Sequence, residues 1–139
     1  MTGLEAANRR PRFAPRRWAF AIAAAVMLGG GALSYAQTAV PPGDAERGRR
    51  VYQVCSGCHS LDEDDVGPRH RGVVGRQAGS VPGYGYSPAL RDSHLSWTPQ
   101  NLDRWLQNPQ ALVPGAKMFF ALADAGARAD VIAYLQQQR

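Results

Sequence analysis

Residues 55–59 read Cys55-Ser56-Gly57-Cys58-His59, and this pattern restricts what the rest of the chain can build. The two thiols are the only cysteines of the chain, two residues separate them, and an imidazole follows directly. The C-x-x-C-H spacing is the attachment signature of a covalently bound haem. Each thiol adds across one vinyl group of the porphyrin, and the adjacent histidine becomes the proximal ligand of the iron. The sequence therefore predicts one haem c, attached through Cys55 and Cys58 and ligated by His59.

Other chemistries use the same pair of cysteines and are weaker interpretations here. A thioredoxin-type redox pair lies at the start of a helix in a strand–helix–strand unit, and this sequence has no strand of convincing alternation. A zinc site needs two further cysteine or histidine ligands at suitable spacing. The remaining histidines, His70 and His94, do not supply that spacing. A plain disulfide would not explain the histidine that follows the second thiol.

The N-terminal quarter has the composition of an export signal. Its first half carries five arginines, an uncharged run follows over 18–33, and Ser34 and Ala36 form a small-x-small cleavage site. The apolar run is shorter than the about 20 residues that span a bilayer. An uncleaved anchor that tethers the domain to the membrane is the alternative to cleavage. We expect a signal peptide over 1–36, a linker over 37–43 and one domain over 44–139, exported to the periplasm.

The positive charge of the chain comes mainly from this export segment. The whole sequence has 16 basic and 11 acidic residues, a net charge of +5. Five of the arginines and one acid, Glu5, precede residue 37, which leaves 11 basic residues against 10 acidic ones. A near-neutral domain does not have the basic surface that nucleic-acid binding requires, so we exclude that class of partner.

Three segments carry helical signals. Asp44 is the predicted N-cap of a helix over 45–55. A second helix begins at Thr98-Pro99, with proline in its first turn, and ends at Asn108-Pro109. A third runs from residue 126 or 127 to 138, with a buried stripe of aliphatic and aromatic residues. The sequence thus predicts an all-α domain of three main helices.

The connection between the first two helices is long and irregular. Residues 60–92 are rich in Gly, Pro, Ser and Asp and show no sustained period, so we expect loops with short turns. A domain of about 100 residues with so little regular structure would bury only a thin core. A large apolar cofactor in the middle would supply the missing core. This reason for a haem does not depend on the cysteine motif.

The second axial ligand of the iron is approached by elimination. Met118 is the only methionine after the export segment, and it lies in a turn between the second and third helices. A lone methionine is usually core packing, but the turn around it and the iron's need for a sixth ligand favour ligation. His70 or His94 as the sixth ligand, and a vacant sixth position, are the two alternatives.

A series of ordered motifs runs through residues 43–138. They read G-D-A-E-R-G-R-R-V-Y, C-S-G-C-H-S, V-G-P, G-V-V-G-R-Q-A-G, P-G-Y-G-Y-S, W-T-x-x-N-L-D-R-W-L-x-N-P, V-P-G-A-K-M and R-A-D-V-I-A-Y-L. In these motifs the domain resembles the soluble class I cytochromes c of bacteria and mitochondria, along nearly its whole length. The resemblance implies the cytochrome c fold, with three main helices and loops around one covalently bound haem.

The resemblance also implies a role for each matching position. Met118 would join His59 as axial ligand, and Pro68 would accept the His59 N–H on its carbonyl, which orients the ring. Gly48 would allow an aromatic residue of the last helix to approach the first helix closely. The other positions are Tyr52 and Tyr134 in that helix contact, Arg76, Tyr86 and Trp97 at the haem propionates, and Trp105 on the methionine side.

Several positions depart from the family's usual residues. Ala116 replaces a threonine whose hydroxyl reaches a propionate, His70 replaces a buried leucine, and Arg71 replaces a histidine. Mitochondrial-type carriers surround the haem edge with lysines, whereas this domain has Lys117 alone and an acidic run over 62–65. We expect that run to be a solvated loop, and at the haem edge it would favour a partner with a basic patch.

The function that the resemblance implies is single-electron transfer by a monomeric periplasmic protein that is not an enzyme. Its partners would be redox proteins, with a reductase or dehydrogenase as donor and an oxidase or other protein as acceptor. It would contact a membrane only if the N-terminal segment is retained. One alternative is a haem subunit bound permanently to an enzyme. The other is a ligand-binding or peroxidatic haem protein with Met118 off the iron.

Overall fold

The computed structural model describes residues 42–139. The predicted signal peptide and all but the last two residues of the predicted linker lie outside this range. Over the described residues the only β-type pairing is an isolated bridge between Gln77 and Ser96, so the all-α class is confirmed. No helix among them is long and apolar enough to cross a bilayer. The helices are α1 (Ala45–Val51), the 3₁₀ turn η1 (Tyr52–Val54), α2 (Pro88–Arg91), α3 (Pro99–Gln107), α4 (Pro109–Leu112) and α5 (Ala125–Gln137).

The first helix begins where the sequence predicts and ends earlier. Asp44 caps α1, and its carboxylate accepts a hydrogen bond from the Arg47 amide at 2.7 Å. The predicted helix over 45–55 is α-helical only to Val51, and η1 tightens the chain before Cys55. Such 3₁₀ turns are common at helix ends because they satisfy the last free carbonyls. The tightened turn leads directly into the C-x-x-C-H segment.

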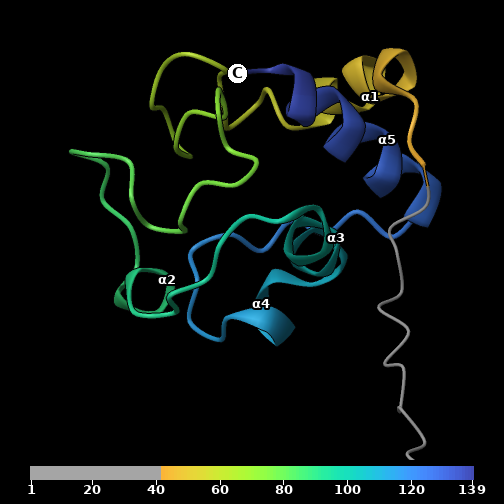
Figure 1. The fold of residues 1–139 in the computed structure, drawn as a ribbon. Helices are drawn as coiled ribbons and strands as arrows, with labels where there is room; N and C mark the ends of the chain where they lie inside the picture. The colour runs from red at the N-terminus through yellow and green to blue at the C-terminus, as the bar shows by residue number, and fades with distance from the viewer. Residues whose placement is uncertain (1–41) are drawn as a thin grey trace, which may run out of the picture. The chain divides into compact units, whose positions relative to one another are not determined.

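Helices α1 and α5 lie side by side (Figure 1). Gly48 makes this possible, because a Cβ at that position would lie 2.0 Å from the Asp130 carbonyl oxygen. The Tyr52 and Tyr134 rings pack at the same contact, with centroids 5.3 Å apart. The predicted contact of the first and last helices through a glycine is therefore present in the structure.

The last helix connects to α3 as well as to α1. Helix α5 begins at Ala125, one or two residues before the predicted start, because Asp124 caps it and accepts from the Ala127 amide at 2.6 Å. The buried Arg128 side chain donates from Nε to Asp103 of α3 at 2.7 Å. The face that packs inward carries Val131, Ile132 and Leu135, each contributing about 1.5–3 kcal/mol by burial.

Two short helices were not predicted from the sequence. The predicted loops with short turns over 60–92 end in one short helix, where Ser87 caps α2 and accepts from the Leu90 amide at 3.2 Å. Asn108 ends α3 as predicted, and its side chain also caps α4 by accepting from the Ala111 amide at 3.1 Å. The residue before a proline favours extended backbone, and Asn108 (φ −162°, ψ 97°) breaks the helix between Gln107 and Pro109.

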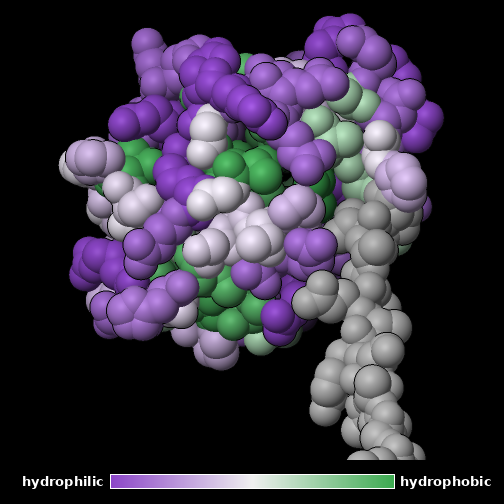
Figure 2. Space-filling model, in the orientation of Figure 1, coloured by the Kyte–Doolittle hydropathy of each residue, from purple (hydrophilic) through white to green (hydrophobic). Residues whose placement is uncertain are grey.

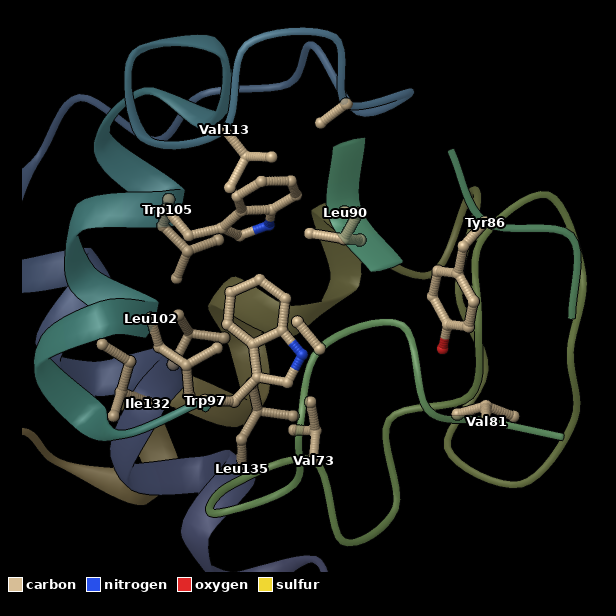
Figure 3. Close-up of a cluster of buried hydrophobic side chains, with 14 of the residues drawn as sticks. Val73, Val81, Tyr86, Leu90, Trp97, Leu102, Trp105, Val113, Ile132 and Leu135 are labelled. Atoms are coloured by element: carbon tan, nitrogen blue, oxygen red, sulfur yellow. The ribbon is translucent and has the colours of Figure 1, made fainter. Parts of the chain in front are cut away.

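Two indole rings form the centre of the core beside α3. Trp97 and Trp105 meet edge to face, with centroids 5.1 Å apart. Figure 3 shows them next to each other, with Leu90 of α2 facing them and Val113 next to Trp105. All four side chains are at most 9% exposed. Helices α2, α3 and α5 therefore meet one shared apolar interior.

Candidate cofactor site

A cavity of about 440 Å³ opens among the loops and helices of the domain. Every site residue that the sequence predicts lines this cavity, although these residues come from several different helices and loops. These residues are Cys55, Cys58, His59, Pro68, Arg76, Tyr86, Trp97, Trp105 and Met118.

The walls of the cavity are mostly apolar. The four large hydrophobic side chains that are exposed among the described residues, Val54, Val66, Phe119 and Phe120, all line it. Figure 2 shows apolar residues in green between polar residues in purple on the face seen in Figure 1. Exposed apolar side chains gathered at one hollow mark a binding site. The site therefore suits a large apolar group with a few polar contacts.

The two thiols lie on one turn of chain. The Cys58 and His59 amides both donate to the Cys55 carbonyl, at 3.1 and 3.0 Å. Both thiols are free, with Cys55 partly buried and Cys58 exposed. Burial raises the pKa of the Cys55 thiol, so it is protonated at neutral pH. Two free thiols on a turn at the cavity wall fit the predicted thioether attachment.

The His59 ring is held in the orientation that a metal ligand requires. Its Nδ1 donates to the Pro68 carbonyl at 2.8 Å, which leaves Nε2 free to bind a metal. Burial lowers the pKa of His59, so the ring is neutral, as ligation demands. A Cβ on Gly67 would lie 2.1 Å from the His59 Cε1. Only glycine leaves room for the ring here, a role that the sequence analysis did not assign.

His70 lies on the His59 side of the cavity. Its ring stacks on that of His59, with centroids 4.0 Å apart and an angle of 20° between the planes. The Tyr52 hydroxyl lies 3.2 Å from the His70 Nδ1. Burial, with His59 and Arg76 nearby, lowers the pKa of His70 to about 3, and burial raises that of Tyr52 to about 12. The hydrogen bond between Tyr52 and His70 therefore joins two neutral groups.

Arg76 supplies a cationic group on the cavity wall. Its guanidinium donates to the Arg69 carbonyl at 2.7 Å and to the Arg71 carbonyl at 3.0 Å. Burial is the main cause that lowers the pKa of Arg76. The backbone bonds fix the fork of the guanidinium, which suits it to bind a carboxylate such as a propionate. Tyr86 and Trp97 line the same cavity, as the sequence predicts.

The acidic run over 62–65 is partly neutralised by its own loop. Arg71 pairs with Asp62, at 3.1 Å from Nη2 to Oδ2, and Arg69 pairs with Asp64 at 3.0 Å. Arg71, which stands where the family usually has histidine, therefore closes the loop instead of entering the cavity. His94 lies in an exposed loop at φ 51° and does not line the cavity.

Comparison with known proteins decides the family. Residues 45–139 match the family described as cytochrome c. The chain belongs to the cytochrome c family. Cytochrome c2 of Rhodomicrobium vannielii is 42% identical over 117 residues, covering 81% of this chain and 94% of that protein. Cytochrome c of Euglena viridis is 43% identical over 98 residues, covering 68% of this chain and 96% of its own.

Solved structures of cytochromes c agree with this assignment. Cytochrome cH from Methylobacterium extorquens superposes with a TM-score of 0.66 at 42% identity, covering 68% of this chain and 98% of its own. The ferricytochrome c2 of Rhodopseudomonas palustris gives the same TM-score at 36% identity, covering 69% and 99%. The predicted cytochrome c fold is thereby confirmed.

Membership of the family settles the class of cofactor and of activity. This cytochrome c carries one covalently bound haem c with its iron, and it is a haem-dependent electron carrier, not an enzyme. The free thiols, the neutral histidine and the apolar walls described above fit that group. Among the described residues the structure has no cluster of three or more His, Cys, Asp and Glu side chains that could hold a metal ion.

Proposed function

We propose that this cytochrome c is an exported single-electron carrier of the periplasm, with His59 and Met118 as the axial ligands of its haem iron. One observation carries the proposal: both thiols, the neutral His59 ring and Met118 line a single apolar cavity. When bound, the haem supplies an iron that cycles between Fe(II) and Fe(III). A thioether and an imidazole as ligands favour the reduced state more than two imidazoles do.

The chain's own residues hold the site in one geometry. The Pro68 carbonyl fixes the His59 ring, and Gly67 leaves space for it. Trp97 and Trp105 exclude water, because their buried rings close one wall of the cavity. Arg76 balances the charge of a propionate. A rigid, dry site needs little rearrangement when one electron arrives or leaves.

The rival sixth ligands are less well supported. His70 stacks flat on His59, so a single iron cannot lie between the two rings, and His94 does not line the cavity. Met118 is partly buried against the core, lines the cavity, and is the remaining one of the candidates that the sequence named. We therefore place Met118 opposite His59 in the proposed site.

The test compares wild type with Met118→Ala and with Ala121→Ser as a control. Ala121 is an exposed residue of the same loop and does not line the cavity. We expect the weak long-wavelength band of methionine–iron ligation in ferric wild type and in Ala121→Ser, together with a high reduction potential. Both should vanish in Met118→Ala. A wild type without the band, or one that binds carbon monoxide readily when reduced, contradicts the proposal and favours the ligand-binding alternative.

The proposed partners are redox proteins that dock briefly at the haem edge, such as a dehydrogenase or reductase as donor and an oxidase as acceptor.

The export proposal rests on the residues before position 37. We expect the protein from the periplasmic fraction to begin at Gln37 when its N-terminus is sequenced. A protein that stays in the membrane fraction with residues 1–36 attached would show an uncleaved anchor.

A further inference from the structure

The backbone that carries Met118 has little support of its own. It follows the turn Val113–Ala116, in which Gly115 adopts φ +87° and the Ala116 amide donates to the Val113 carbonyl at 3.1 Å. Over the described residues, the next backbone bond along the chain joins the Leu122 amide to the Leu106 carbonyl. Within residues 42–139, the backbone groups of Met118 take part in a single hydrogen bond, and its donor is a side chain.

That side chain is Gln110 of α4. Its Nε2 donates to the Ala116 carbonyl at 2.8 Å and to the Met118 carbonyl at 2.9 Å. Its Oε1 accepts from the Gly115 amide at 3.2 Å. If the Gln110 amide group were turned by 180°, its oxygen would face two carbonyl oxygens. The three partners therefore fix the orientation of this amide group. Both amide protons and the acceptor of one side chain thus bind the segment that ends at Met118.

Helix α4 gives Gln110 a firm base. Pro109, the residue before it, is fully buried, and the Asn108 side chain caps the helix on the Ala111 amide. Gln110 itself is partly buried. The other side-chain bond of this segment runs from the Lys117 Nζ to the Gly85 carbonyl, which leaves Met118 itself held through Gln110.

We propose that Gln110 is a positioning residue for the sixth ligand, and that its amide keeps Met118 on the iron against competing ligands. This inference rests on the proposed ligation by Met118. A small ligand binds the iron only in molecules whose methionine has left it. The apparent dissociation constant therefore falls in proportion as that population rises. In a variant without the Gln110 bonds, fewer hydrogen bonds break when the methionine leaves the iron. The fraction of molecules whose methionine is off the iron is therefore larger.

The experiment is a titration of the ferric holoprotein with imidazole, followed by its absorption spectrum. Gln110→Glu keeps the shape and the acceptor but sets a carboxylate against two carbonyls. Gln110→Met keeps the length and removes all three bonds. Gln107→Glu is the control, since Gln107 is exposed on α3 and its side chain makes no hydrogen bond to any residue that the structure describes. Urea unfolding of each variant measures global stability separately.

Both Gln110 variants should bind imidazole about tenfold more tightly than wild type, the factor expected for the loss of one to two ordinary hydrogen bonds. Their methionine–iron band should also disappear at a lower temperature. Gln107→Glu should behave as wild type. If either Gln110 variant fails to yield holoprotein, the other and Gln110→Asn, whose amide is one methylene too short, decide the question.

The outcomes separate this inference from the proposed function. A wild type with the methionine–iron band, whose Gln110 variants bind imidazole with unchanged affinity, overturns the positioning role alone. A wild type without the band overturns ligation by Met118 and the inference with it. The specific role of Gln110 is also overturned if Gln107→Glu binds imidazole as tightly as the Gln110 variants do, and if the tighter binding in all of them follows the loss of global stability.

Discussion

The imidazole of His70 lies flat against the imidazole of His59, with ring centroids 4.0 Å apart. The family usually has a leucine at position 70, so this protein has a polar ring beside His59 where an aliphatic side chain is usual. The Tyr52 hydroxyl lies within hydrogen-bond distance of the His70 Nδ1 and helps to hold this ring in place. The depressed pKa keeps it neutral at physiological pH. With His59 as the proposed iron ligand, we expect His70 to act on the iron through its dipole and polarisability and not through a charge.

Replacing His70 by leucine should raise the reduction potential. A polar ring beside the axial ligand stabilises the extra positive charge of the ferric state, and an aliphatic side chain of similar size does so less well. An equilibrium redox titration of His70→Leu against wild type measures the shift. His94→Asn is the control, because it also removes a histidine, lies away from the cavity, and its φ of 51° is one that asparagine tolerates. An unchanged or lower potential in His70→Leu would show that the stacked ring does not tune the iron.

Gly67→Ala should prevent normal haem attachment. The added Cβ would lie 2.1 Å from the His59 Cε1 and 2.4 Å from its Nδ1, so the ring must turn and give up the Pro68 carbonyl. Overpacking of this kind costs about 1–3 kcal/mol and here displaces a ligand as well. We expect much less haem absorbance per polypeptide in the purified protein.

Gly57→Ala is the matched control for that substitution. Gly57 lies between the two cysteines, and a Cβ there meets nothing within 4 Å. The same chemical change should therefore leave haem content near that of wild type. Equal haem content in Gly67→Ala and Gly57→Ala would mean that the loop around His59 moves more easily than the geometry suggests.

Local signals made much of the fold predictable. The caps at Asp44 and Thr98, followed by alanine and proline in the first turn, placed the starts of α1 and α3 correctly. Helix α5 begins one or two residues before its predicted start because Asp124 caps it. Helices α2 and α4 have four residues each, too few for a period to show. Their signal is the cap alone, at Ser87 and Asn108.

The candidate site was predictable where a motif supplies the chemistry. The C-x-x-C-H pattern and the resemblance to cytochromes c named residues that line one cavity. The roles of Gly67, His70 and Gln110 were missed because they depend on contacts between loops. Gln110 meets the Met118 carbonyl eight residues away, and His70 meets His59 only because the intervening chain folds back. No local period records such a contact.

The pair of Arg47 and Asp130 should make the stability of the domain sensitive to acid. The Asp130 carboxylate accepts from the Arg47 Nε and the Asp44 amide, both at 2.7 Å, and thus joins α1 to α5. These partners, with the Arg47 bond as the larger cause, lower the pKa of Asp130 below its ordinary value of 3.8. A carboxyl whose pKa is lower in the folded state contributes stability above its unfolded pKa, and loses it as pH falls through the folded pKa.

Urea unfolding of wild type and Asp130→Asn, from pH 7 down to about pH 2, tests this sign. The free-energy difference between them should be largest above about pH 4 and should shrink in stronger acid, where the wild-type carboxyl is protonated too. Glu46→Gln is the control. Glu46 faces Arg49 at 3.6 Å with both side chains more than half exposed, so its loss should change little at any pH. A difference for Asp130→Asn that stays constant with pH would mean that only the shape of the side chain, and not its charge, joins the two helices.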